Sequence, residues 1–248
     1  MPEVHDVVLG EGPAACPGVL AVPGAAPTGG VVVVQEAYGL TGHIRAICDR
    51  LADAGFVAVA PALFHRLGAP VLGYDELDRA MTLLRRLRAD EIRSDITASV
   101  GHLRQLGIAA SGQGIVGFCM GGSISLIMAT EAEFGAAVTF YGGGVARGRF
   151  GFPALADAAP SLRVPWLGLY GDQDHTIPVE QVERLRAQAA LAPTPAEVIR
   201  YADAGHGFNC DDRPSFVPDA AADAWSRTLR WLRHHLAPQP AGPGDPNS

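Results

Sequence analysis

The chain has 248 residues, of which 48% are hydrophobic, and a formal net charge of −7 at pH 7. This length and this hydrophobic content suit one α/β domain with a large core. The acidic balance argues against nucleic acid as a partner, because phosphate binding requires a basic field.

The first part of the sequence predicts a hairpin followed by an alternating α/β pattern. Two short strand-like runs, around Val4–Leu9 and Gly18–Val22, are separated by turn residues. The β-branched run Val31–Val34 suits a strand that is buried on both faces. A helix is expected near His43–Ala54, and a second buried strand, Phe56–Ala60, follows it.

The rest of the chain continues the alternation of helices and strands. Two apolar stripes at helical spacing predict two helices between Tyr74 and Leu106. The other expected elements are a strand at Gly114–Phe118, a helix through Ala129, strands at Ala136–Tyr141 and Val164–Tyr170, a helix at Glu180–Ala190, a strand at Glu197–Tyr201 and a last helix at about Ala220–Leu236. A Gly-, Ala- and Pro-rich excursion without a predicted element runs to Pro160.

This order predicts an α/β fold with a mostly parallel central sheet, helices on both faces and an antiparallel N-terminal edge. Residues 1–236 are expected to form a single domain, and the polar, Pro- and Gly-rich residues 237–248 a disordered tail. No apolar run approaches the roughly 20 residues of a membrane span, and no signal-peptide pattern opens the sequence. We therefore expect a cytoplasmic protein, monomeric by default, that has no membrane partner.

One cysteine lies in a glycine-rich corner between a predicted strand and a predicted helix. The pattern Gly117-x-Cys119-x-Gly121 is that of a nucleophile elbow with cysteine in place of serine. A Cβ at either glycine would clash, because the strand and helix backbones nearly touch at such a turn. The helix N-terminus favours a thiolate, and the amide of Met120 would face an oxyanion formed beside the sulfur. A cysteine that only packs between glycines is the alternative.

Two later loops offer the other members of a candidate catalytic triad. The stretch GDQDHTIP follows a predicted strand and contains Asp172 and Asp174. Asp174 fits the Gly-x-x-Asp loop in which such acids usually lie, whereas Asp172 is interpreted as a turn former. His206, flanked by Gly205 and Gly207, follows the last predicted strand. Nucleophile, acid and histidine thus occur in the chain order of the α/β-hydrolases.

Glu36 directly follows a strand that is expected to be central. A buried carboxylate costs several kcal/mol unless it is paired or protonated, so this position suggests a function. A strand-end carboxylate that faces solvent is the alternative. The other cysteines, Cys16, Cys48 and Cys210, show no zinc spacing and are expected to be thiols in a reduced cytoplasm. The histidines form no metal-binding motif, so no metal site is expected.

Four segments together resemble the dienelactone hydrolases, also called carboxymethylenebutenolidases. The segments are VVVVQEAYGLTGHIRAICDRLADAGFVAVAP, GFCMGG, GDQDHTIP and AGHGFNC, and the similarity runs from about Val31 to Leu236. The resemblance implies an α/β-hydrolase fold and a hydrolase of esters or lactones. The catalytic residues that it implies are Cys119, Asp174 and His206, with Glu36 assisting.

The resemblance also implies the surroundings of the nucleophile. The resting thiol would be largely neutral and would contact Glu36, which helps to take its proton once substrate binds. The backbone amides of Ala37 and Met120 would form the oxyanion hole. The side chains expected to line the substrate pocket are Tyr38, Phe64, His65, Arg79, Tyr141, Phe208 and Arg213.

The chain departs from the family pattern in its arginines. The best-known members carry an arginine four residues after the histidine, where this chain has Cys210, and Arg213 lies a little further on. Arg79 is a candidate for a second arginine of the family that precedes the helical region. Ala62 replaces the acid of the family's Pro-Asp-Leu-Phe segment. These differences leave the triad intact, but they do not favour dienelactone itself as the substrate.

The expected function is hydrolysis of small activated esters or enol lactones through a thioester on the cysteine, with no cofactor. Thioesterase or acyltransferase chemistry on the same triad is one alternative, and a non-catalytic ligand receptor of the same fold is another. Flavodoxin-like proteins resembling glutamine amidotransferases also combine a glutamate with an elbow cysteine. They lack the late aspartate and histidine in this order.

Overall fold

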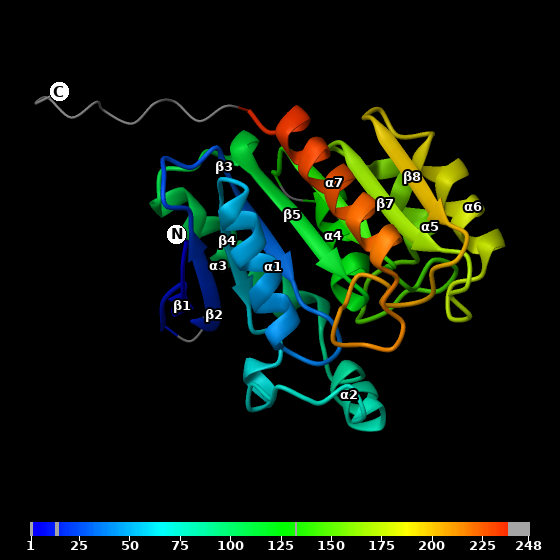
Figure 1. Cartoon of the computed structure of the whole chain (residues 1–248), viewed down its shortest axis with the longest axis horizontal. Helices are drawn as coiled ribbons and strands as arrows, with labels where there is room; N and C mark the ends of the chain where they lie inside the picture. The colour runs from blue at the N-terminus through cyan, green and yellow to red at the C-terminus, as the bar shows by residue number, and fades with distance from the viewer. Residues whose placement is uncertain (1, 13–14, 132, 238–248) are drawn as a thin grey trace, which may run out of the picture.

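A computed structural model describes residues 2–12, 15–131 and 133–237, and its strands form one central sheet (Figure 1). The described strands are β1 (Glu3–Leu9), β2 (Cys16–Val22), β3 (Gly29–Val34), β4 (Phe56–Pro61), β5 (Gln113–Phe118), β6 (Ala136–Phe140), β7 (Trp166–Gly171) and β8 (Ala196–Tyr201). The expected disordered tail, residues 237–248, lies outside the described residues except for Ala237.

The sheet has the strand order β1-β2-β4-β3-β5-β6-β7-β8 in the described part of the chain. β1 pairs antiparallel with β2, and β2 pairs antiparallel with β4. Every pairing from β4 to β8 is parallel. The expected mostly parallel sheet with an antiparallel N-terminal edge is therefore confirmed. Every residue of β3 and β5 is buried, as expected of parallel strands that are covered on both faces.

Helices cover both faces of the sheet. The described α-helices are α1 (Gly42–Asp53), α2 (Leu77–Leu84), α3 (Ala89–Gln105), α4 (Met120–Glu131), α5 (Leu155–Ala158), α6 (Val179–Ala189) and α7 (Pro218–His235), and short 3₁₀ helices are η2 (His65–Leu67), η3 (Ala110–Gly112) and η4 (Ala159–Ser161). In Figure 1, α1 and α7 lie in front of the sheet, and α3 and α4 lie behind it. From Met120 to Ala129, α4 is buried on all sides, which marks it as the most central helix.

The structure differs from the expected elements at a few places. The excursion that ends at Pro160 contains the short helix α5, which its Gly-, Ala- and Pro-rich composition did not indicate. The strand expected at Phe56–Ala60 extends by one residue, because β4 includes Pro61. Pro61 pairs with Gly18 at the end of the β2–β4 pairing. At a terminal position the missing N–H of proline disrupts little of the strand pairing.

The parallel order brings the carboxyl ends of β3, β5, β7 and β8 to the same edge of the sheet. The loops that follow these strands contain Glu36, Cys119, Asp174 and His206. In open α/β sheets the crevice at this edge is the usual place for ligands. Within the described residues, no helix has the length and apolar character needed to cross a membrane.

Candidate functional site

Cys119 lies in a strained turn between β5 and α4. Its φ of 54° falls in the left-handed region, which residues other than glycine rarely adopt. A Cβ on Gly117 would overlap the carbonyl oxygen of Gly121, and a Cβ on Gly121 would overlap that of Val34. The Cys119 amide donates to the Phe140 carbonyl at 3.1 Å. Tight packing on both sides thus fixes the turn and leaves the cysteine only partly buried.

His206 and Asp174 form a short hydrogen bond beside this turn. Nδ1 of His206 lies 2.6 Å from Oδ2 of Asp174, a carboxylate that is almost fully buried. The other oxygen of Asp174 accepts from the amide and the hydroxyl of Thr176, at 2.8 and 2.6 Å. Cys119 lies near enough to His206 for its charge to help raise the pKa of the imidazole. The three residues expected to form a triad are therefore brought together.

The charges of these groups stabilise one another. Burial alone would lower the pKa of His206, but the charge of Cys119 and the hydrogen bonds to Asp174 and Cys119 outweigh it and raise the pKa to about 10. Burial alone would raise the pKa of Asp174, but the hydrogen bonds from His206 and Thr176 hold it below its usual value. An imidazolium is thus stabilised between Cys119 and a buried carboxylate, which is a suitable arrangement for nucleophilic catalysis.

Glu36 is fully buried. The alternative interpretation, a strand-end carboxylate that faces solvent, is therefore wrong. Its Oε1 accepts from the Tyr141 hydroxyl at 3.2 Å and lies 3.8 Å from Nη1 of Arg213. Its Oε2 is buried and has no hydrogen-bond partner among the described residues. A buried carboxylate oxygen without a partner is costly, which favours a function for it.

Tyr141, Tyr38 and Arg213 surround the carboxylate. Burial, together with the charges of Glu36 and Cys119, raises the pKa of Tyr141 well above its ordinary value, so its hydroxyl stays a donor. Burial also raises the pKa of Tyr38, with the charges of Cys119 and Glu36 adding to it and that of Arg213 opposing. The guanidinium carbon of Arg213 lies 5.8 Å from the centre of the Tyr38 ring. These three expected pocket residues therefore lie close to Cys119.

The position of the family's expected arginine is occupied by Cys210, which is buried beside Tyr74. Sγ of Cys210 lies 3.2 Å from the Tyr74 hydroxyl, which in turn lies 3.4 Å from Oγ1 of Thr41. Burial raises the pKa of Cys210 to about 11, so this thiol stays protonated near neutral pH. Cys210 therefore offers no positive charge at this position, and the nearby positive charge is that of Arg213.

Four expected pocket residues have other surroundings. Phe64 is 1% exposed and packs in the core, and His65 lies 3.2 Å from the buried carboxylate of Asp95. Arg79 is an exposed residue of α2 that pairs with Glu76. Phe208 is fully buried and packs against the Tyr141 ring. The structure thus gives these residues packing or pairing contacts, and Phe208 alone of the four touches a side chain of the site.

Thr176 is a residue of the site that sequence reasoning missed. Its amide and hydroxyl both donate to Asp174, two residues earlier, and its Oγ1 lies 3.4 Å from Nδ1 of His206. A threonine two residues after an aspartate can form this local turn, so the sequence held a signal for it. Asp172 instead pairs with Arg200, and both of its oxygens accept at 2.7 Å.

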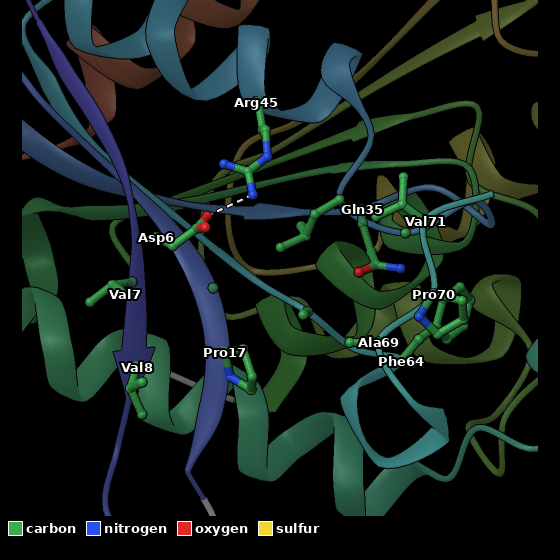
Figure 2. Close-up of a pocket in the computed structure, with 14 residues that line it drawn as sticks. Asp6, Val7, Val8, Pro17, Gln35, Arg45, Phe64, Ala69, Pro70 and Val71 are labelled. Atoms are coloured by element: carbon green, nitrogen blue, oxygen red, sulfur yellow. Dashed lines mark hydrogen bonds and ion pairs between the residues drawn. The ribbon is translucent and has the colours of Figure 1, made fainter. Parts of the chain in front are cut away.

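A cavity of about 380 Å³ lies behind the loop that follows Glu36, between the β1–β2 hairpin and the residues around Phe64 (Figure 2). Asp6 and Arg45 pair across it at 2.6 Å. The Gln35 side chain, which also lines it, already bonds the carbonyl of Glu36 and the amide of Leu63. The polar side chains of Asp6, Arg45 and Gln35 therefore already have partners. Cys119 does not line this cavity, which is separate from the cysteine turn.

Among the residues that the structure describes, two groups of side chains have spacing that could hold a metal ion. They are Cys16, His65 and Asp95, and His43, Cys210 and Asp211. In the first group, Arg66 already bonds both oxygens of Asp95, at 2.8 and 2.9 Å, which opposes a cation there. Both groups join residues that are distant in the sequence, so motif spacing could not have revealed them.

Comparison with known proteins gives consistent results. The family model described as "Dienelactone hydrolase family" matches residues 16–236. A protein of Escherichia coli (strain K12) named "Putative carboxymethylenebutenolidase" is 40% identical over 211 residues, which cover 83% of this chain and 76% of that protein. The "Carboxymethylenebutenolidase" of Pseudomonas sp. (strain P51) is 28% identical over 208 residues, covering 82% of this chain and 83% of that one.

A solved structure shows the same similarity in three dimensions. It is the "Crystal Structure of Putative Dienelactone Hydrolase from Klebsiella pneumoniae subsp. pneumoniae MGH 78578". Its sequence is 33% identical, and the superposition has a TM-score of 0.85 over 94% of this chain and 98% of that one. The two chains therefore share their fold along nearly their whole length.

Proposed function

The chain belongs to the dienelactone hydrolase family, and on that premise we propose that it hydrolyses small activated esters or enol lactones through a thioester on Cys119. The observation that carries the proposal is the meeting of Cys119, His206 and Asp174 at one edge of the sheet, where His206 bonds Asp174 at 2.6 Å and the charge of Cys119 helps raise the pKa of His206. A strained turn, an imidazole and a buried carboxylate in this arrangement are the parts of a nucleophilic triad.

The first step is activation of the thiol. Oε2 of Glu36, which lacks a partner among the described residues, is available to accept the thiol proton. Tyr141 and Arg213 hold the other oxygen of the carboxylate and so orient it. In the acylation step His206 then stabilises the thiolate, since its raised pKa favours the imidazolium beside a negative sulfur.

The thiolate attacks the carbonyl carbon, and the carbon–oxygen double bond becomes a single bond to an oxyanion. The amides of Ala37 and Met120 are the proposed donors to this oxygen, and loss of one such donor typically lowers the rate by about 10²–10³. The oxyanion collapses, the bond to the leaving oxygen breaks, and the imidazolium of His206 gives its proton to that oxygen. In a lactone this step opens the ring.

Deacylation returns the enzyme to its starting state. The neutral imidazole of His206 takes a proton from water, and the hydroxide attacks the thioester carbon. Asp174 stabilises the imidazolium that forms, because it accepts the hydrogen bond from Nδ1 at 2.6 Å. Collapse of the second oxyanion releases the acid and the thiolate, which is reprotonated. An amide suits this chemistry less well, because the thiolate leaves more easily than an amine.

The test is a substrate panel of aryl esters, lactones and acyl thioesters with wild type and Cys119→Ala. We expect the wild type to hydrolyse activated aryl esters and Cys119→Ala to lose this activity by at least about 10³-fold. Mass spectrometry of a rapidly quenched reaction should find the acyl group on the peptide that contains Cys119. Wild-type rates in Cys119→Ala would exclude the thiol mechanism, and tight binding of esters without turnover would indicate a receptor instead.

His206→Ala and Asp174→Asn separate this proposal from glutamine amidotransferase-like chemistry. Both substitutions should lower ester hydrolysis strongly, because both residues act in the same proton transfers. Asp172→Asn is the matched control, since Asp172 pairs with Arg200 and lies outside the triad. Equal losses in Asp172→Asn and Asp174→Asn would contradict the assignment of the acid.

A further inference from the structure

Three side chains with metal-binding atoms meet between the first turn of α1 and the loop that follows His206. His43 belongs to α1, whereas Cys210 and Asp211 belong to the loop between β8 and α7, drawn in orange in Figure 1. One ring nitrogen of His43, Sγ of Cys210 and one carboxylate oxygen of Asp211 all lie within 4.8 Å of one another. The fold thus joins an imidazole to a thiol and a carboxylate, and the imidazole and carboxylate are 168 residues apart in the chain.

The separations in this cluster are close to those of a zinc site. Zinc takes sulfur, nitrogen and carboxylate ligands at about 2.0–2.3 Å in a tetrahedron, so its ligand atoms lie about 3.3–3.8 Å apart. Nδ1 of His43 and Oδ1 of Asp211 already lie 3.4 Å apart. The other separations, which are at most 4.8 Å, have to shorten by no more than about 1.5 Å. Small side-chain rotations supply this, and the Asp211 side chain, which is 72% exposed, has room for one.

The His43 imidazole lacks hydrogen bonds of ordinary length among the described residues. Its Nε2 is buried and has no partner there. Its Nδ1 contacts only the Asp211 carboxylate, at 3.4 Å, which is longer than the usual N–H···O bond of about 2.7–3.2 Å. The ring is almost fully buried, so these poorly satisfied nitrogens cost stability. Coordination of a metal ion by the ring would offset part of that cost, because neutral imidazole is a common metal ligand.

The charges around the cluster leave room for a cation. Among the described residues no arginine forms an ion pair with Asp211. Arg50 and Arg213 act on the cluster electrostatically, but each has another partner. The guanidinium of Arg50 lies 4.0 Å from the centre of the Trp225 ring, and that of Arg213 lies 3.8 Å from the Glu36 carboxylate. The carboxylate of Asp211 is therefore not neutralised by a guanidinium.

We propose that His43, Cys210 and Asp211 form a binding site for a thiophilic divalent metal ion, with Zn²⁺ as the ion that fits best. Thiolate, imidazole and carboxylate are the donors that zinc takes in proteins. Because Asp211 is exposed, water completes the fourth position. The bound ion joins α1 to the loop between β8 and α7 and so stabilises the folded chain. This inference does not depend on the proposed hydrolysis.

The test starts from the Cys119→Ala variant, because Cys119 and His206 could themselves bind a thiophilic ion. Zn²⁺ titrated calorimetrically into this variant should bind at one ion per chain. Co²⁺ is the spectroscopic probe, and it should produce a sulfur-to-cobalt charge-transfer absorption, which requires a thiolate ligand. Saturable binding that is present in the wild type and lost in Cys119→Ala would assign the ion to the proposed catalytic residues. That result, or no saturable binding to either protein, would overturn the inference.

Variants of the ligands are made in the same Cys119→Ala background. Cys210→Ala, Asp211→Asn and His43→Gln should each weaken Zn²⁺ binding by about tenfold or more, and Cys210→Ala should also abolish the charge-transfer absorption. Asp211→Asn is the variant least able to disturb folding, because its side chain is exposed. Saturating Zn²⁺ should therefore raise the unfolding temperature of the background protein clearly more than that of Asp211→Asn.

Cys16→Ala, in the same background, is the matched control. It removes a buried thiol from the other group with metal-binding spacing, in which Arg66 already bonds both oxygens of Asp95. Its Zn²⁺ affinity should equal that of the background protein. An affinity that Cys210→Ala or Asp211→Asn leaves unchanged, or that Cys16→Ala lowers as much as they do, would show that the ion does not bind at the proposed site.

Discussion

The proton on His206 links the site to the stability of the protein. Burial lowers the pKa of this imidazole, but Cys119 and Asp174 outweigh burial and raise it from 6.5 to about 10. A histidine whose folded pKa is raised stabilises the folded state fully below its unfolded pKa, and this contribution is lost as the pH rises through the folded value. The window here is therefore from about pH 6.5 to about pH 10.

We expect the stability difference between wild type and His206→Gln to shrink as the pH is raised across this window. The measurement is denaturant unfolding of both proteins at a series of pH values. In the Cys119→Ala background the change should be smaller, because the charge of Cys119 is a main cause of the raised pKa. A difference that is constant from pH 6.5 to pH 10 would show that the imidazole does not gain its proton on folding.

Residue types and chain order were enough to single out three residues that the fold brings together at the candidate site. Cys119, Asp174 and His206 each follow a strand in a glycine-containing loop, and these local patterns are visible in the sequence. The partners of Glu36 were not predictable in the same way. Tyr141 and Arg213 lie about a hundred residues or more away along the chain, and only the folded geometry shows that both contact one oxygen of the carboxylate.

At the scale of elements, the turn from β5 to α4 is the most constrained junction near the site. A Cβ at Gly121 would meet the backbone oxygens of Val34 and Gln35, which belong to the strand and loop beside it. Backbone oxygens in a packed sheet cannot move away as a flexible side chain would. The spacing of β3, β5 and α4 therefore depends on this glycine.

Gly121→Ala should destabilise the fold by about 3 kcal/mol or more, or prevent folding, because the extra methyl group overpacks the junction. Gly101→Ala is the matched control, since Gly101 lies in α3 and has open space where a Cβ would stand. That control should be neutral or more stable by about 0.5–1 kcal/mol. Chemical denaturation measures both, and similar stability of the two variants would contradict the close contact.

The elements themselves were largely predictable, whereas their pairing was less so. Runs such as Val31–Val34 are β-branched and apolar throughout, which marks a buried strand whatever its neighbours are. The short helix Leu155–Ala158 was not predicted, because alanine, glycine and proline around it give no apolar periodicity. The strand order, in which β4 lies between β2 and β3, depends on contacts between distant residues that local patterns do not specify.

At the scale of the whole molecule, the expectation of a single domain can be tested with the buried thiols. Cys16 and Cys48 are fully buried, and burial raises the pKa of each to about 12, so both should be unreactive in the native state. They lie in the N-terminal half of the chain. The tryptophans Trp166, Trp225 and Trp231 lie in the C-terminal half.

If residues 1–236 unfold as one unit, thiol exposure and tryptophan emission should change at the same denaturant concentration. The experiment follows labelling of Cys16 and Cys48 in a Cys119→Ala/Cys210→Ala background, which removes the partly accessible thiol and the buried thiol of the C-terminal half. Separate midpoints for the two probes would show that the halves unfold independently.

The chain order of the four proposed catalytic residues also governs when a growing polypeptide can become active. Glu36 and Cys119 leave the ribosome first, whereas the imidazole arrives with β8 and the loop after it, about ninety residues behind the sulfur. The central strands can assemble while the chain is still being made, since folding during synthesis starts from the N-terminus. On the proposed mechanism, a nascent chain therefore carries Glu36 and the sulfur without the imidazole, and hydrolysis must wait until translation has passed His206.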